Sequence, residues 1–176
     1  MLPIPALPLL VALASHAADP PSPKRGAQAD TAIARIRREY AEVNAMLPGC
    51  EHRTQDVSGE SLEGGSMTVH RCGGAIRKIE VTYYGETGRA TKEWYLSGER
   101  PFFLYVVDTR YDQPFGRVAG RSEERVYWAG GRAIRWLDAG RARATGTAEA
   151  AERMGELREE IADLLDRART GRTDAN

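Results

Sequence analysis

Two cysteines and two histidines are the residues whose types and spacing most directly suggest chemistry. They form the mirror-image motifs Cys50-x-His52 and His70-x-Cys72. Thiolate and imidazole groups are good zinc ligands, so these four side chains could in principle form a tetrahedral site. Their spacing matches no common zinc motif, and an even pair of cysteines in an oxidising compartment is most simply a disulfide. We predict a Cys50–Cys72 disulfide worth about 3 kcal/mol, with no metal and no cofactor; a zinc site and free thiols are the alternatives.

Glu80 and Glu93 are the one candidate pair for catalysis. If the strands that contain them pair antiparallel, their Cβ atoms lie about 5 Å apart, and two ionised carboxylates that close repel each other. Such a pair suits general acid–base work and has the spacing of retaining glycosidases. Neighbouring Lys or Arg side chains could neutralise both groups, and an open sheet face provides no cleft. A carboxylate-pair hydrolase is therefore an alternative function, not the preferred one.

The sequence contains no common catalytic motif, and its basic residues do not outnumber its acidic residues. It contains no G-x-S-x-G, H-E-x-x-H or C-x-x-C motif and no glycine-rich phosphate loop. Its 25 Lys and Arg residues balance 25 Asp and Glu residues, and the two signs are interspersed. We therefore expect neither nucleic acid nor an anionic membrane as a partner.

The N-terminal residues predict export. Residues 1–17 carry no charged side chain and end in the small-x-small pattern Ser15-x-Ala17. Their apolar run is shorter than the ~20 residues of a membrane-spanning helix, as in a signal peptide cleaved after Ala17. We expect a signal peptide over 1–17, a flexible Pro-rich leader over 18–29 and a periplasmic or secreted mature protein without a membrane span.

Two segments have the period of amphipathic helices on either side of the remaining chain. In the first, Asp30 is the expected N-cap and Pro48-Gly49 the stop. In the second, Thr147 is the expected N-cap. The apolar stripes are Ile33, Ile36, Tyr40, Val43 and Leu47 in the first helix, and Ala150, Met154, Leu157, Ile161, Leu164, Leu165 and Ala168 in the second.

Between these helices the apolar period changes to two, as in β-strands. Short glycine-containing connections favour antiparallel neighbours. We predict an α+β fold: an N-terminal helix, an antiparallel meander of five to six strands, and a C-terminal helix packed on one sheet face. The single domain spans 30–170, followed by a disordered tail over 171–176. The predicted strands are 67–71, 76–84, 89–96, 101–108, 122–128 and 132–137, with one long loop over 109–121.

The 85–88 turn fixes the register between the predicted strands 76–84 and 89–96. It places Tyr84 opposite Arg89, and therefore Glu80 opposite Glu93. One side of the sheet then carries the core residues Ile79, Val81, Trp94, Val126 and Trp128, beneath the helices. The other, solvent-facing side carries Lys78, Glu80, Tyr84, Glu93, Tyr95, Arg125 and Tyr127.

The solvent-facing side is the predicted binding surface. Tyrosine offers a large contact area and a polar tip, so Lys78, Tyr84, Tyr95, Arg125 and Tyr127 form a plausible interaction face. The alternative is that these aromatic residues only make cross-strand pairs on an exposed sheet.

Several motifs along the chain together carry a family resemblance. They are Ser61-Leu62-Glu63-Gly64-Gly65, Ile76-Arg77-Lys78-Ile79, Tyr84-Gly85-Glu86-Thr87-Gly88, Glu93-Trp94-Tyr95-Leu96, Phe103-Leu104-Tyr105-Val106, Glu124-Arg125-Val126-Tyr127-Trp128 and Ile134-Arg135-Trp136-Leu137. With these motifs the chain resembles a group of small exported bacterial proteins of unknown function. The resemblance covers most of the mature chain and implies an extracytoplasmic fold without an assigned activity.

Three functions follow from these observations. The preferred one is a non-enzymatic envelope protein that binds a protein or glycan through the Tyr- and charge-rich sheet face. The second is the carboxylate-pair hydrolase. The third is a structural subunit of an envelope complex, which an undocked apolar helix stripe would favour.

Overall fold

The fold is a meander sheet with one long helix on each face. The computed structural model describes residues 23–57 and 63–171; the predicted signal peptide and residues 172–176 lie outside this part. The elements are α1 (Pro23–Met46), the short 3-10 helix η1 (Leu47–Gly49), β1 (Glu51–Val57), β2 (Gly65–Cys72), β3 (Ala75–Gly85), β4 (Gly88–Ser97), β5 (Arg100–Tyr111), β6 (Val118–Ala129), β7 (Arg132–Asp138), β8 (Arg141–Arg143) and α2 (Ala148–Thr170).

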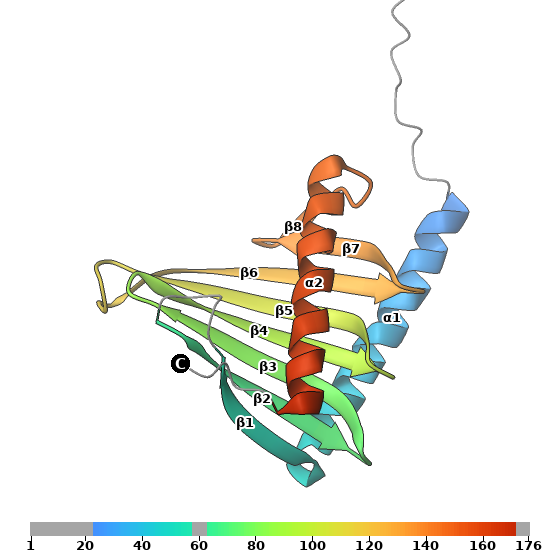
Figure 1. Ribbon diagram of the computed structural model, residues 1–176. Helices are drawn as coiled ribbons and strands as arrows, with labels where there is room; N and C mark the ends of the chain where they lie inside the picture. The colour runs from blue at the N-terminus through green and yellow to red at the C-terminus, as the bar shows by residue number, and fades with distance from the viewer. Residues whose placement is uncertain (1–22, 58–62, 172–176) are drawn as a thin grey trace, which may run out of the picture.

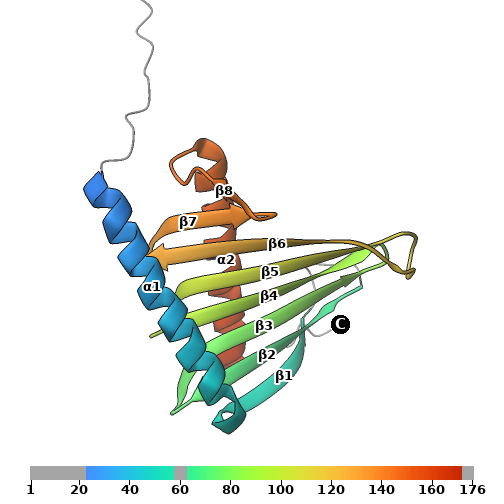
Figure 2. The same cartoon turned by 180° about the vertical axis from the view of Figure 1, so that it is seen from behind.

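The described strands form one antiparallel sheet in the order β1-β2-β3-β4-β5-β6-β7-β8. The predicted α+β class and meander are confirmed, but the expectation of five to six strands is too low, since the sheet has eight. Helix α2 crosses one face (Figure 1), and helix α1 lies on the opposite face (Figure 2). Strands β3 to β6 extend well beyond both helices (Figures 1 and 2).

Glycine pairs explain the tight turns of this meander. Gly73 and Gly74 connect β2 to β3, and Gly130 and Gly131 connect β6 to β7, all with positive φ between 57° and 80°. Two successive residues with positive φ form the turn whose twist matches that of a two-stranded antiparallel ribbon. Each strand therefore pairs with the next one along the chain.

Helix α2 agrees closely with its sequence pattern. It begins after Thr147, whose side chain accepts a hydrogen bond from the Ala150 N–H. The six stripe residues from Ala150 to Leu165 are buried against the inner face of the sheet, the face that α2 covers. This face contains the predicted core residues Ile79, Val81, Trp94, Val126 and Trp128. The C-terminal helix thus packs on the predicted face.

Helix α1 differs from the prediction at its beginning. It starts at Pro23, so residues 23–29 of the expected leader are helical and Asp30 is not an N-cap. Asp30 lies within the helix and forms an ion pair with Arg135 of β7 at 3.1 Å. Ile33, Ile36 and Val43 are buried, but against the face opposite α2.

The sheet is larger than predicted because three segments were assigned incorrectly or missed. Strand β1 was missed because five of its seven residues are exposed, as expected of a polar edge strand. Strand β8 has only three residues, all exposed. The predicted long loop over 109–121 is wrong, since β5 continues to Tyr111 and β6 begins at Val118. The shorter connection folds back on the β3–β4 turn, where the Phe115 N–H donates to the Glu86 carbonyl at 2.7 Å.

The Cys50–Cys72 disulfide is present, with Cα atoms 4.6 Å apart. It joins the residue before β1 to the last residue of β2. The bond therefore closes the open end of the β1–β2 hairpin, where the polar edge strand has little apolar contact of its own.

We expect reduction of this disulfide to lower the free energy of unfolding by about 3 kcal/mol, because the reduced unfolded chain gains conformational entropy. Urea denaturation of the oxidised protein and of the Cys50→Ser/Cys72→Ser double variant measures the difference. Two free thiols in the denatured, unreduced protein would contradict the bond.

A second prediction separates the core from the exposed sheet. Trp94 is fully buried in the inner core, so Trp94→Ala should lower the free energy of unfolding by about 3–5 kcal/mol. Tyr84 is 44% exposed, and Tyr84→Ala should cost no more than about 1 kcal/mol. Equal losses in both variants, measured by urea denaturation, would show that Tyr84 also belongs to a core.

Candidate functional site

The candidate site is the part of the outer face that α1 leaves uncovered. We call the side of the sheet that carries Lys78, Glu80, Glu93 and Tyr95 the outer face. The observed pairs Lys78–Tyr95, Glu80–Glu93 and Tyr84–Arg89 are those predicted from the 85–88 turn. The division of residues between the two faces is therefore correct.

The expectation that the whole outer face meets solvent is wrong. Lys78, Tyr95 and Tyr127 are only 5%, 0% and 6% exposed: α1 packs over Tyr95 and Tyr127, and Lys78 lies against the Tyr95 ring. The reason is a second apolar row across the sheet, in which Tyr95 pairs with Phe103 and Phe103 pairs with Tyr127. This row accepts the α1 stripe, and the two helices therefore take opposite faces.

The signal for this second core is present in β5. Phe102, Phe103 and Leu104 are three consecutive apolar residues, all buried in the structure. A strand with apolar residues on both sides is buried on both faces, whereas alternation indicates one solvent face. Strict alternation in β3 and β4 led to the one-sided prediction.

The Glu80–Glu93 pair is bridged by the buried Lys78 ammonium. Lys78 forms ion pairs with Glu80 and with Glu93, the latter at 3.1 Å, and its Nζ lies 5.1 Å from the centre of the Tyr95 ring. A cation between two carboxylates compensates the repulsion that a bare pair would have. The geometry is that of a charge-balanced cluster next to α1.

Tyr95 connects this cluster to the helix. Its hydroxyl lies 2.8 Å from the Glu93 carboxylate and 3.1 Å from the Asn44 side-chain oxygen on α1. Burial raises the pKa of the Tyr95 hydroxyl well above its usual value, and the hydrogen bond with Glu93 and its negative charge raise it further. Tyr95 therefore stays neutral and acts as a polar link within an apolar row.

His70 lies beside the same cluster, 3.8 Å from Glu80, and its ring faces His52 with centres 6.0 Å apart. Burial is the main cause that lowers the pKa of His70, although Glu80 opposes the shift. Because Cys50 and Cys72 are bonded to each other, their thiols are not available as ligands. Among residues 23–57 and 63–171, no group of three His, Cys, Asp or Glu side chains is arranged to hold a metal.

Beyond α1, the outer face continues as two polar rows. The outermost row runs Tyr84, Arg89, Thr109 and Arg121 across β3 to β6. The next row contains Thr82 and Thr91, whose hydroxyls lie 3.3 Å apart. Tyr84, Arg89 and Arg121 are exposed, so this part of the predicted binding face is accessible.

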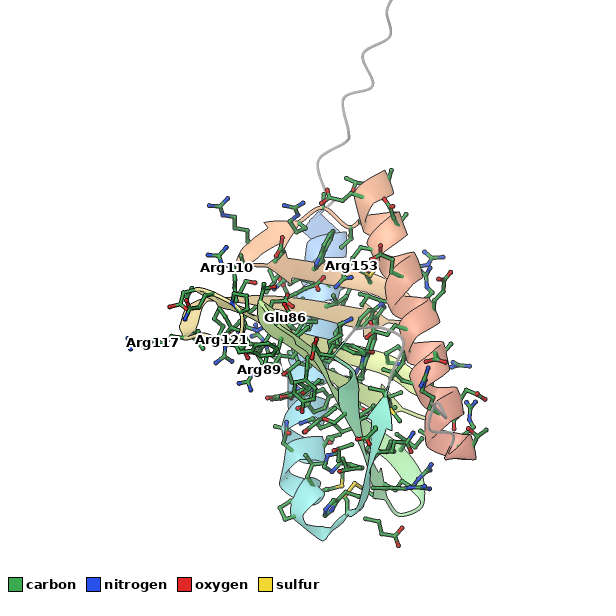
Figure 3. All side chains as sticks on the ribbon, turned by 60° about the vertical axis from the view of Figure 1, so that its left-hand side comes forward. Glu86, Arg89, Arg110, Arg117, Arg121 and Arg153 are labelled. Carbon is green, nitrogen blue, oxygen red and sulfur yellow. A yellow bond between two sulfur atoms is a disulfide. The ribbon has the colours of Figure 1, made fainter. Side chains whose placement is uncertain are left out.

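Arginines gather at this end of the sheet. Arg89, Arg110, Arg117 and Arg121 lie around the tips of the β3–β4 and β5–β6 hairpins, away from Arg153 on α2 (Figure 3). Within the described part of the chain, Arg89, Arg110 and Arg117 form no ion pair, whereas Arg153 pairs with Glu124 at 2.6 Å. Over 84–89 and 109–121 these four arginines outnumber two acidic residues, Glu86 and Asp112, so the uncovered end carries a net positive charge despite the neutral composition.

A pocket of about 360 Å³ opens where α1 meets the uncovered part of the outer face. We call it the α1 pocket. It contains Arg125 and Tyr127 of the predicted binding face together with residues that the sequence did not single out as a site. Its lining is Ile36, Arg37, Tyr40, Phe103, Tyr105, Arg125 and Tyr127.

Two polar residues shape the sheet side of the α1 pocket. Arg125 forms an ion pair with Glu123 at 2.5 Å, and its guanidinium lies 5.4 Å from the centre of the Tyr105 ring. Partial burial, followed by a hydrogen bond with Glu123, raises the pKa of Tyr105, while Arg121 opposes the shift. Tyr105 could have been found by extending the strand register, since it pairs with both Glu93 and Arg125.

Comparison of the chain with protein-family models, curated proteins and solved structures finds no match. In the part of the chain that the structure describes, neither helix is apolar enough over sufficient length to cross a membrane.

The neutral state of Tyr95 generates a pH prediction. An unfolded tyrosine ionises near pH 10, whereas folded Tyr95 stays protonated at that pH because its pKa is raised. Its contribution to stability is complete below about pH 10 and is lost as the pH rises further. Tyr95→Phe lacks this contribution, so the stability difference between wild type and variant should shrink from about pH 8 to about pH 11.

Urea denaturation followed by circular dichroism at each pH measures this difference. Tyr84→Phe is the matched control, since Tyr84 is exposed on the same face. A wild-type advantage over Tyr95→Phe that stays constant up to pH 11 would contradict the prediction.

Proposed function

We propose that the protein is an exported, non-enzymatic binding module that binds a component of the cell envelope through the uncovered part of its outer face. One observation carries the proposal: β3 to β6 extend beyond α1 and present Tyr84, Arg89 and Arg121 in one exposed row. Exposed tyrosines and arginines are the side chains most often found at the energetic centre of interfaces.

The charge of the uncovered end favours an anionic partner. Arg89 lies in the exposed outer row and Arg117 at the β5–β6 tip, and neither forms an ion pair among the described residues, so their positive charges are available to a ligand. Guanidinium groups form paired hydrogen bonds with carboxylates and phosphates. An envelope protein or glycan that carries acidic groups would complement this surface.

The two alternative functions receive less support. Lys78 forms ion pairs with both Glu80 and Glu93. In a hydrolase these carboxylates would have to transfer protons, and the ion pairs oppose their protonation. A structural subunit was expected to leave the apolar stripe of one helix undocked. In the structure, apolar stripe residues of both helices are buried against the sheet.

Export is the other part of the proposal. The uncharged apolar leader and Ser15-x-Ala17 support it from the sequence. The Cys50–Cys72 disulfide supports it from the structure, since such bonds persist mainly in oxidising compartments.

Site-specific photo-crosslinking in intact cells tests the binding surface. A photoreactive amino acid at Tyr84 or Arg121 should form a crosslink to a discrete envelope component. The same amino acid at Arg38 of α1 or Glu159 of α2 is the matched control, because both positions are exposed and lie outside the outer face of the sheet.

Crosslinks confined to positions 84 and 121 would support the proposal, and loss of the crosslink from position 121 in an Arg89→Ala background would assign the contact to this row. Equal crosslinks from all four positions, or none from the outer face, would overturn it.

A further inference from the structure

The α1 pocket has preformed aromatic walls. Tyr40 contacts Phe103 with ring centres 5.4 Å apart at an interplanar angle of 83°, and Phe103 contacts Tyr127 at 4.9 Å. Phe103 and Tyr127 are only 7% and 6% exposed, and they are fixed by the row that anchors α1. Phe103 and Tyr127 therefore hold their positions without a ligand and support the Tyr40 ring, which is 38% exposed and offers the apolar surface.

The rim of the pocket is positively charged. Arg37 of α1 and Arg125 of β6 both line it, and no carboxylate does so among the described residues. Glu123 is engaged with Arg125 and with Tyr105. Arg37 is exposed and forms no ion pair within the described residues. One guanidinium charge at the rim is thus left for a ligand.

Aromatic walls and a free guanidinium select one chemical class. Ring faces and edges favour a planar apolar group, and a guanidinium favours a carboxylate, sulfonate or phosphate. A volume of about 360 Å³ is at the small end of ligand pockets, which suits a small molecule of one or two ring systems and not a polymer.

We propose that the α1 pocket binds a planar aromatic group bearing an acidic substituent, with the rings against Tyr40, Phe103 and Tyr127 and the anion at Arg37. This inference goes beyond the proposed function, since the α1 pocket contains none of the residues of the Tyr84, Arg89 and Arg121 row and its ligand is a small molecule. The ligand is a small molecule that binds between α1 and the sheet.

Two probes with related ring systems test the assignment. Anilinonaphthalene sulfonate (ANS) carries both features, and phenylnaphthylamine lacks the sulfonate. Wild-type protein should bind ANS saturably at one site, detected by fluorescence, and bind phenylnaphthylamine more weakly. Arg37→Gln should weaken ANS binding roughly tenfold, the effect of one charge-assisted contact, and change the uncharged probe less than about twofold.

Arg38→Gln is the matched control, because Arg38 is also exposed on α1 but does not line the pocket. Tyr40→Ala should weaken both probes, and circular dichroism checks that each variant is folded. Chemical-shift changes on ANS addition should centre on Ile36 and Tyr127.

The inference is overturned if ANS binds without saturation, if Arg37→Gln affects both probes equally, or if Arg38→Gln has the same effect as Arg37→Gln. Failure of the probes while crosslinks persist from positions 84 and 121 would reject the pocket ligand alone. Loss of those crosslinks with intact ANS binding would reject the macromolecular interface alone.

Discussion

The packing of α1 against the row Tyr95, Phe103 and Tyr127 determines which surface the protein has available. Apolar burial is worth roughly 25 cal/mol per Å², so a helix stripe and an aromatic row of matching length associate strongly. The contact makes the sheet two-sided, with a separate core on each face. It also divides the outer face into a part under the helix and a part beyond it. The α1 pocket and the Lys78 cluster lie beside the helix, and the exposed row lies at the outer end of the uncovered part.

The Lys78 cluster is a consequence of this packing. Without α1, Lys78, Glu80 and Glu93 would be ordinary cross-strand charges on a wet sheet, each worth a fraction of a kcal/mol. Beside the Tyr95 ring that α1 covers, Lys78 is largely removed from water, and a buried charge must be paired and hydrogen-bonded. The two glutamates meet that requirement from adjacent strands. Glu80 and Glu93, which the sequence suggests as a catalytic pair, therefore form ion pairs with Lys78 in the structure.

The sequence predicted the features that depend on residues close together in the chain. It did not predict how elements that are distant in the chain pack against each other. The β3–β4 register followed from one turn, because pairing fixes every partner once the turn is set. Helix α2 followed from its cap and stripe. Neither the strand register nor the apolar stripe of α1 predicts which face of the sheet α1 covers, because a stripe shows only that one side of the helix is buried. The α1 pocket combines Arg37 and Tyr40 with Tyr105 and Arg125, so no single-segment pattern could have found it.

The extension of the sheet beyond both helices is the feature that folding alone does not require. Ordering each residue costs about 1–2 kcal/mol of conformational entropy, and the outermost strand segments bury little apolar surface in return. Backbone pairing, hydroxyl contacts such as Thr82–Thr91 and the fold-back of the β5–β6 connection onto the β3–β4 turn stabilise them instead. These contacts hold Arg89 and Arg121 on opposite sides of Thr109, from β4 and β6. A rigid platform of this kind lowers the entropy cost of binding, so the protruding strands suit the recognition role that we propose better than a shorter sheet would.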